Sequence, residues 1–179
     1  MIRVGQGYDV HAFAGEEAGG TAGSTESYVT LGGVRIPHCR PLVAHSDGDV
    51  LVHALCDALL GAAALGDIGR LFPDHDSRYR GISSLLLLEN VIAKLESAGW
   101  ILLNADMTVI AQKPKIAPHA QAMVNRLAGT IACRPEQLSI KATTSEGLGA
   151  MGRGEGIAVQ AVALIRRRDD KEFENGSCQ

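Results

Sequence analysis

Three residues have the types and spacing of metal ligands. Asp9 and His11 are two residues apart in the stretch GYDVHAF, so on a β-strand both side chains would leave the same face. His53 lies in an Ala- and Leu-rich stretch, four residues after Asp49 and four before Asp57. A helix there would place the side chains of Asp49, His53 and Asp57 in one narrow wedge. Asp9, His11 and His53 together would supply three zinc ligands and leave the fourth tetrahedral position open for a substrate.

A solvated helix edge is the simpler explanation of the wedge. However, residues 45 to 69 contain no Lys or Arg, and every acid among them is Asp. Short carboxylates and imidazoles reach a cation with little loss of side-chain entropy, which favours a metal site. D-x-H is a weak signal by itself, so the zinc hypothesis depends on its combination with His53. The opposite arc of the helix is the predicted core stripe and contains Leu51, Ala54, Leu55, Ala58, Leu59 and Ala62.

A second stretch, KATTSEGLGAMGRGEGIA, combines hydroxyl side chains with glycine. The glycines alone are explained by a wide turn between two strands. They do not explain Thr143, Thr144 and Ser145 in a row beside Glu146. Hydroxyls and backbone amides donate to phosphate oxygens, and a neighbouring carboxylate suits a hard ion such as Mg²⁺ on the same phosphates. Phosphate binding and a plain turn therefore remain equal alternatives, and the stretch is not a Walker A loop.

The stretch AQKPKIAPH, residues 111 to 119, follows an apolar run and is stiffened by Pro114 and Pro118. It is either a loop of fixed shape or a segment whose exposed backbone amides and carbonyls read the edge of a base. No residue within it decides between the two.

The elements that must position these groups follow from hydrophobic periodicity and from turn signals. Strands are expected over residues 2–13, within a hairpin over 28–37 around Gly32 and Gly33, and over 101–112, 137–144 and 156–167. Helices are expected over about 49–65, 84–98 and 118–132. Ser46 or Asp47 would cap the first helix, Gly99 would end the second, and Pro118 would open the third. This pattern predicts an α+β fold, a mixed β-sheet with helices packed on one face, although the strand order does not follow from it.

Composition excludes several classes of protein. The chain has 179 residues and a formal net charge of −3, with no basic face for nucleic acid and no sign of a membrane protein. Its four separated cysteines indicate neither a disulfide framework nor a thiolate zinc cluster, and a cytoplasmic protein is expected. The opening residues show neither a secretory signal nor a transit peptide. We expect one domain over residues 1–168 and a disordered charged tail over 169–179.

Four motifs together resemble the 2-C-methyl-D-erythritol 2,4-cyclodiphosphate synthase family of the non-mevalonate isoprenoid pathway. They are GYDVHAF, HSDGDVLVHALCDALLGAAALGDIGRLFPDHD, AQKPKIAPH and KATTSEGLGAMGRGEGIA, and the resemblance runs from about Ile2 to Arg166. It implies a lyase that closes a cyclic diphosphate. The 2-phosphate of 4-diphosphocytidyl-2-C-methyl-D-erythritol 2-phosphate would attack the β-phosphorus of its own cytidine diphosphate arm and expel CMP.

The resemblance also implies roles for individual residues. Asp9, His11 and His53 match zinc ligands, with one Zn²⁺ per subunit, and Glu146 matches a ligand of Mg²⁺ or Mn²⁺. His45 and Thr144 match catalytic residues that stabilise the transition state. The remaining matches are substrate contacts: Ser46 at the methylerythritol phosphate, Asp67, Ile68 and Gly69 at the ribose, Phe72, Pro73, Asp74, His75 and Asp76 in the methylerythritol pocket, Ala111, Gln112, Lys113, Pro114, Lys115, Ile116 and Ala117 at cytosine, and Thr143, Ser145, Ala150 and Arg153.

The family resembled is a homotrimer with active sites between subunits, so a homotrimer is expected here. The sequence departs from the family pattern in the longer loop from Gly15 to Ser27, in Gln6 where many members have His, and in Ala150 where several have Phe. The last two put a secondary isoprenoid diphosphate ligand on the trimer axis in doubt, although Arg153 could still bind an anion there.

Two other functions compete with the cyclase. One is a zinc-dependent nucleotide phosphohydrolase that uses metal-bound water. The other is a non-catalytic trimeric binding module in which zinc serves structure alone.

Overall fold

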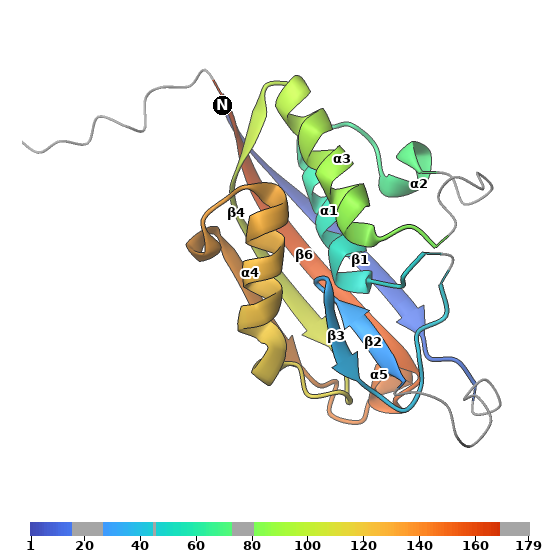
Figure 1. Ribbon diagram of the computed structural model, residues 1–179. Helices are drawn as coiled ribbons and strands as arrows, with labels where there is room; N and C mark the ends of the chain where they lie inside the picture. Colours follow the sequence, from blue (N-terminus) through green and yellow to red (C-terminus); the bar gives the residue numbers. More distant parts are fainter. Residues whose placement is uncertain (16–26, 45, 73–80, 169–179) are drawn as a thin grey trace, which may run out of the picture.

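A four-stranded mixed sheet forms one layer of the molecule. The computed structural model describes residues 1–15, 27–44, 46–72 and 81–168. The sheet has the order β1-β6-β4-β5, in which β4 and β5 are parallel and the other pairs antiparallel. Its strands are β1 (Ile2–Ala12), β4 (Trp100–Ile110), β5 (Leu138–Thr143) and β6 (Gly156–Arg167). The carboxyl ends of β1, β4 and β5 therefore meet at the same end of the sheet (Figure 1).

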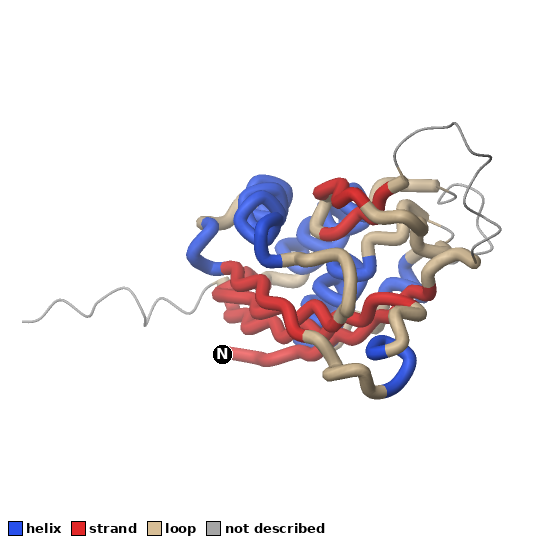
Figure 2. The backbone as a smooth tube through the Cα atoms, turned by 90° about the horizontal axis from the view of Figure 1, so that it is seen from below, coloured by secondary structure: helices blue, strands red, loops and turns tan. Residues whose placement is uncertain are grey.

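Three long helices form the second layer: α1 (Val50–Ala63), α3 (Ser84–Ser97) and α4 (Ala120–Ile131). Figure 2 shows them together on one side of the strands, which confirms the predicted α+β arrangement. α3 is followed by Gly99 with φ of 77°, so the predicted stop is confirmed. Pro118 does not open α4 directly, because it lies in a separate 3₁₀ turn, η3 (Ala117–His119).

The predicted hairpin is confirmed as β2 (Tyr28–Leu31) and β3 (Val34–Pro37). Gly32 and Gly33 both have positive φ, 56° and 71°, as the central residues of a tight hairpin turn require. A Cβ at Gly32 would meet Met123 of α4 at 2.8 Å, and one at Gly33 would meet Leu85 of α3 at 2.7 Å. The hairpin is thus seated on the helical layer.

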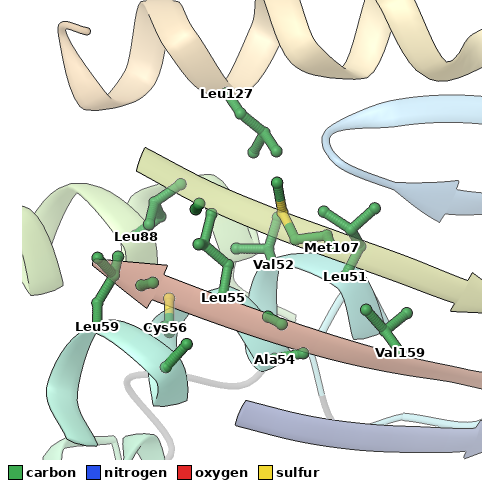
Figure 3. Packing of buried hydrophobic residues seen from close by; sticks show 14 of the residues in the cluster. Leu51, Val52, Ala54, Leu55, Cys56, Leu59, Leu88, Met107, Leu127 and Val159 are labelled. Carbon is green, nitrogen blue, oxygen red and sulfur yellow. The ribbon is translucent and has the colours of Figure 1, made fainter. Parts of the chain in front are cut away.

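α1 lies directly against β1, because two glycines of the strand leave room for the helix backbone. A Cβ on Gly7 would stand 1.9 Å from the carbonyl oxygen of Ala54, and one on Gly5 would stand 2.0 Å from that of Ala58. The helix is also more deeply buried than the predicted stripe, since 12 of its 14 residues are buried. Figure 3 shows the reason: α1 contributes side chains to a core that α3, α4 and the sheet close around it.

Three short elements were not anticipated: α2 (Ile68–Leu71), η4 (Pro135–Gln137) and α5 (Gly149–Gly152). They are only one turn long, so they have no hydrophobic period to detect. α5 lies inside the stretch predicted as a glycine-rich turn. The loop from Gly15 to Ser27 falls mostly outside the described residues, and the predicted tail over 169–179 falls outside them completely.

The face of the sheet turned away from the helices carries exposed apolar side chains. Val4 of β1 is 66% exposed, and Ile2, Tyr8 and Val10 of the same strand and Val162 of β6 are 44 to 52% exposed. Within the described ranges, no helix has the length and apolar composition that a membrane-spanning segment needs.

Candidate active site

The three predicted zinc ligands converge where α1 crosses β1. The Asp9 carboxylate oxygen Oδ2 lies 3.0 Å from His11 Nε2 and 3.0 Å from His53 Nδ1. One ligand atom from each residue falls within 4.8 Å of the others. His53 is buried, and Asp9 and His11 are half-buried. The structure thus brings together Asp9, His11 and His53, the three residues that the sequence spacing predicts as one cluster.

The hydrogen bond that His11 makes away from the cluster determines which of its two nitrogens has a free lone pair. Its Nδ1 lies 2.9 Å from the carbonyl oxygen of Val43. A carbonyl oxygen can only accept, so Nδ1 carries the proton and the neutral ring has its lone pair at Nε2. That lone pair faces the Asp9 carboxylate, which also only accepts. Two acceptors at this distance need a positive charge between them.

The electrostatics of the cluster favour such a charge. Partial burial opposes ionisation of Asp9, but the close contacts with His11 and His53 outweigh it and hold the Asp9 pKa well below its usual range. The close contact with the Asp9 carboxylate is the main cause that raises the His11 pKa. One carboxylate oxygen and two imidazole nitrogens are a donor set that fits Zn²⁺. The residues therefore suit the metal that the resemblance implies.

Hydroxyl groups surround the outer nitrogen of His53. Ser84 Oγ lies 2.9 Å from His53 Nε2, and Ser46 Oγ lies 3.3 Å from the same nitrogen. Ser46 was a predicted site residue, and the structure places it beside His53, a candidate metal ligand. Ser84 was missed. Its sequence signal is only that of a residue at the start of a helix, and its distance of 31 positions from His53 concealed the contact.

The other two members of the predicted wedge serve the fold. Asp49 caps α1 by accepting from Val52 N at 3.1 Å, and it also accepts from Gly32 N and Gly33 N at 2.9 and 2.7 Å. Burial raises its pKa to about 6, against the three N–H donors. Asp57 accepts from Ile68 N at 2.9 Å, and burial raises its pKa as well.

The prediction that Ser46 or Asp47 caps α1 is therefore wrong. Asp47 accepts from Ser84 N at 2.9 Å and so caps α3 instead. Asp49 caps α1 and also accepts from two hairpin amides, of which that of Gly32 is buried and needs a partner, while that of Gly33 is part-buried.

The hydroxyl-rich stretch follows β5 at the end of the sheet. Thr144 Oγ1 donates to Glu146 Oε1 at 2.7 Å, and Glu146 has a positive φ of 51°. The Thr143 hydroxyl donates to the carbonyl oxygen of Thr144, and that of Ser145 to the carbonyl oxygen of Leu148. Glu146 is exposed and stands apart from the cluster of Asp9, His11 and His53, the one such group among the described residues.

The predicted cytosine segment is joined to this stretch by a hydrogen bond from Ala111 N to the carbonyl oxygen of Thr143, 3.1 Å long. Ala111 and Ile116 are buried, which anchors the segment against the core. Gln112, Lys113, Pro114, Lys115 and Ala117 are the other members. The two stretches lie together because β4 and β5 are parallel neighbours.

The remaining predicted contacts are more scattered. Asp67 caps α2 by accepting from Arg70 N at 2.9 Å, Ile68 and Gly69 are the first residues of that helix, and Phe72 follows it. Ala150 lies in α5, and Arg153 Nε donates to Glu155 Oε1 at 2.6 Å. His45, Pro73, Asp74, His75 and Asp76 lie outside the described residues.

The fold and site define a class of protein: a single-domain α+β protein whose mixed sheet and helical layer present a His₂Asp cluster able to hold a divalent metal. Residues 2–166 match the YgbB family, and the chain belongs to that family.

Several known proteins are similar over nearly the whole chain. The 2-C-methyl-D-erythritol 2,4-cyclodiphosphate synthase of Azotobacter vinelandii is 56% identical, over 92% of this chain and 98% of that protein. The synthase of Thioalkalivibrio sulfidiphilus is 57% identical, over 92% of this chain and 96% of that protein. Among solved structures, the CDP complex of Plasmodium falciparum IspF is 32% identical with a TM-score of 0.78, covering 94% of this chain and 97% of that one.

Proposed function

We propose that this protein converts 4-diphosphocytidyl-2-C-methyl-D-erythritol 2-phosphate to 2-C-methyl-D-erythritol 2,4-cyclodiphosphate and CMP, as a phosphorus–oxygen lyase of isoprenoid biosynthesis. The observation that carries the proposal is the convergence of Asp9, His11 and His53 in a chain of the YgbB family. The names of the relatives support this reaction, and CDP in the Plasmodium falciparum structure supports a substrate linked to cytidine diphosphate.

In the proposed reaction, an oxygen of the 2-phosphate bonds to the β-phosphorus, and the bond from that phosphorus to the oxygen of CMP breaks. A phosphate is already ionised at neutral pH, so no side chain has to act as general base. The protein must instead fold an anionic chain back on itself and hold it in that geometry. Bound divalent cations supply the positive charge that offsets the repulsion between the phosphates.

The residues divide this work among them. Asp9, His11 and His53 would hold Zn²⁺, and Glu146 would hold Mg²⁺ or Mn²⁺ beside the Thr144 hydroxyl. His45 and Thr144 would stabilise the transition state. The other contacts proposed for the substrate are Ser46, Asp67, Ile68, Gly69, Phe72, Pro73, Asp74, His75, Asp76, residues 111–117, Thr143, Ser145, Ala150 and Arg153.

We further propose a homotrimer whose active sites lie between subunits. In one chain, the zinc ligands belong to the edge strand β1 and the Thr144–Glu146 stretch follows the opposite edge strand β5. These strands are separated by three strand spacings, about 14 Å, which argues for a neighbouring chain at each site. The exposed apolar side chains of β1 and β6 offer a surface for that contact.

We also propose a cytoplasmic location. It is supported by the described cysteines, Cys39, Cys56 and Cys133, which are free, as is usual in a reducing compartment.

A product assay tests the reaction. Purified protein is incubated with the cytidyl substrate and Mg²⁺, with and without a zinc chelator, and products are followed by ³¹P NMR. Cyclodiphosphate and CMP, both lost with the chelator, are expected. The phosphohydrolase alternative predicts acyclic phosphates. Their formation in place of cyclodiphosphate would refute the proposed cyclisation.

A second experiment separates catalysis from a structural role of zinc. His53→Ala is expected to remain a folded trimer that has lost zinc and turnover. Unfolding of this variant would instead favour the non-catalytic binding module.

Glu146→Gln is expected to respond more weakly to Mg²⁺ with its zinc content intact, and zinc loss in that variant would contradict the assignment of two separate ion sites.

A further inference from the structure

A buried hydroxyl connects the loop before α1 to a proposed zinc ligand. Ser84, the first residue of α3, is 0% exposed. Its backbone N donates to Asp47 Oδ2 at 2.9 Å, and its Oγ donates to Asp47 Oδ1. One carboxylate thus accepts both protons that Ser84 can donate. On its other side, Ser84 Oγ lies 2.9 Å from His53 Nε2.

Counting protons fixes the direction of the bond to His53. A serine hydroxyl has one proton, and a carboxylate can only accept. Because the Ser84 proton is committed to Asp47, the oxygen can only accept from His53. Nε2 of His53 must then carry a proton, and the lone pair of the neutral ring is at Nδ1. Nδ1 is the nitrogen that faces Asp9 Oδ2 at 3.0 Å.

His11 has the same arrangement with a different partner. The carbonyl oxygen of Val43 fixes a proton on Nδ1, so the lone pair at Nε2 faces the same carboxylate oxygen of Asp9. Both imidazoles therefore have their protons outward and their lone pairs inward. Ser46 Oγ is a longer contact to His53 Nε2, at 3.3 Å, and does not alter this count.

We infer that Ser84, oriented by Asp47, is a positioning residue that fixes the tautomer and ring orientation of His53 for metal binding. The inference rests on the proposed zinc site, and it adds two residues that act on the metal through a ligand. A hydrogen-bond partner of this kind typically changes metal affinity by about 10- to 100-fold. Asp47 also follows Ser46, so the same carboxylate ties a proposed substrate-contacting loop to the zinc ligand.

The first test reads the proton itself. ¹H–¹⁵N spectra of the zinc-loaded protein with ¹⁵N-labelled histidine should show a His53 Nε2 proton that exchanges slowly with water. Ser84→Ala should lose this protection, whereas Ser97→Ala, at the exposed end of the same helix, should keep it. A proton on Nδ1 of His53, or protection unchanged in Ser84→Ala, would overturn the inference.

The second test measures zinc affinity by chelator competition. Ser84→Ala is expected to bind zinc about 10- to 100-fold more weakly, Ser84→Thr to recover much of the affinity through its hydroxyl, and Ser97→Ala to match the parent. If Ser84 served only the fold, Ser84→Ala would lower the unfolding temperature and leave the zinc dissociation constant unchanged. That result would refute the positioning role. If zinc addition moves no His53 signal in the parent protein, the proposed zinc site itself is wrong. The spectra thereby distinguish a wrong zinc site from a wrong role for Ser84.

Discussion

At the scale of single residues, the acids around α1 perform different tasks although their spacing is regular. Asp49 is completely buried, and burial raises its pKa to about 6 from the ordinary value of 3.8 for an aspartate. Between these values the folded state keeps a proton that the unfolded chain has released. The free energy of unfolding therefore falls as pH rises through this window, and the loss is complete above the folded pKa.

Asp49→Asn removes this titration and provides the test. The stability of the parent relative to the variant should decrease from about pH 4 to pH 6 and then become level. Urea unfolding across this range measures it. Asp106→Asn is a suitable contrast, because the hydrogen bond from Lys141 lowers the pKa of Asp106 and its contribution is lost as pH falls. A relative stability of the Asp49 variant that stays constant over the window would contradict the expectation.

The candidate site shows which residue-level features the sequence contains. The D-x-H spacing and the helical position of His53 were sufficient to predict the metal cluster, because both depend on local periodicity. The roles of Asp47, Asp49 and Ser84 were not predictable in this way. Each depends on contacts between α1, α3 and the hairpin, and no spacing within one element encodes those contacts.

At the scale of elements, the close contact of α1 with β1 positions the whole cluster. Gly7→Ala would place a Cβ 1.9 Å from the carbonyl oxygen of Ala54, so the helix and the strand must move apart. We expect a destabilisation of about 1–3 kcal/mol, the usual cost of overpacking a core. Zinc affinity should fall too, because His53 lies on the helix and Asp9 on the strand. Chemical unfolding and zinc titration measure the two effects.

Gly129→Ala is the matched control, since nothing lies within 4 Å of the added Cβ in α4. It should be neutral or stabilising by up to about 1 kcal/mol through helix propensity. A Gly7→Ala protein with parent-like zinc affinity would show that the approach of α1 to β1 does not set the site.

Elements were predictable where the sequence has a hydrophobic period or a hairpin signal. The last strand, β6, has the predicted bounds, and each long helix lies within about two residues of its predicted range. α2 and α5 are single turns and carry no period. The insertion of β6 between β1 and β4 was also not predictable, because strand order depends on pairings between distant segments.

At the scale of the whole molecule, the exposed apolar face of the sheet makes self-association testable. Val4 is 66% exposed on β1, so Val4→Lys should change the stability of an isolated chain by no more than about 0.5 kcal/mol. Buried in an interface, the added charge is costly, and sedimentation should show a shift from trimer to monomer. Leu86→Lys, on the 48% exposed Leu86 of α3, should leave the mass unchanged. A Val4→Lys protein with the parent's mass would place the interface elsewhere.

Active sites shared between subunits predict recovery of activity when two impaired variants are assembled into the same trimer. His53→Ala lacks a zinc ligand, and Glu146→Gln lacks the ligand of the second ion. If each site takes its zinc ligands from one chain and Glu146 from the next, random co-assembly leaves about a quarter of the sites with neither change.

Co-expression with two different tags, followed by purification of mixed trimers, measures this recovery. Turnover of about a third of the parent's value is expected, because every trimer that contains both variants has one unchanged site among its three. Each variant alone and a mixture of preformed trimers should stay well below this value. If both ions were bound within one chain, every site would carry one of the two changes and mixed trimers would recover nothing. The separation of β1 from β5 across the sheet makes the shared arrangement the expected result.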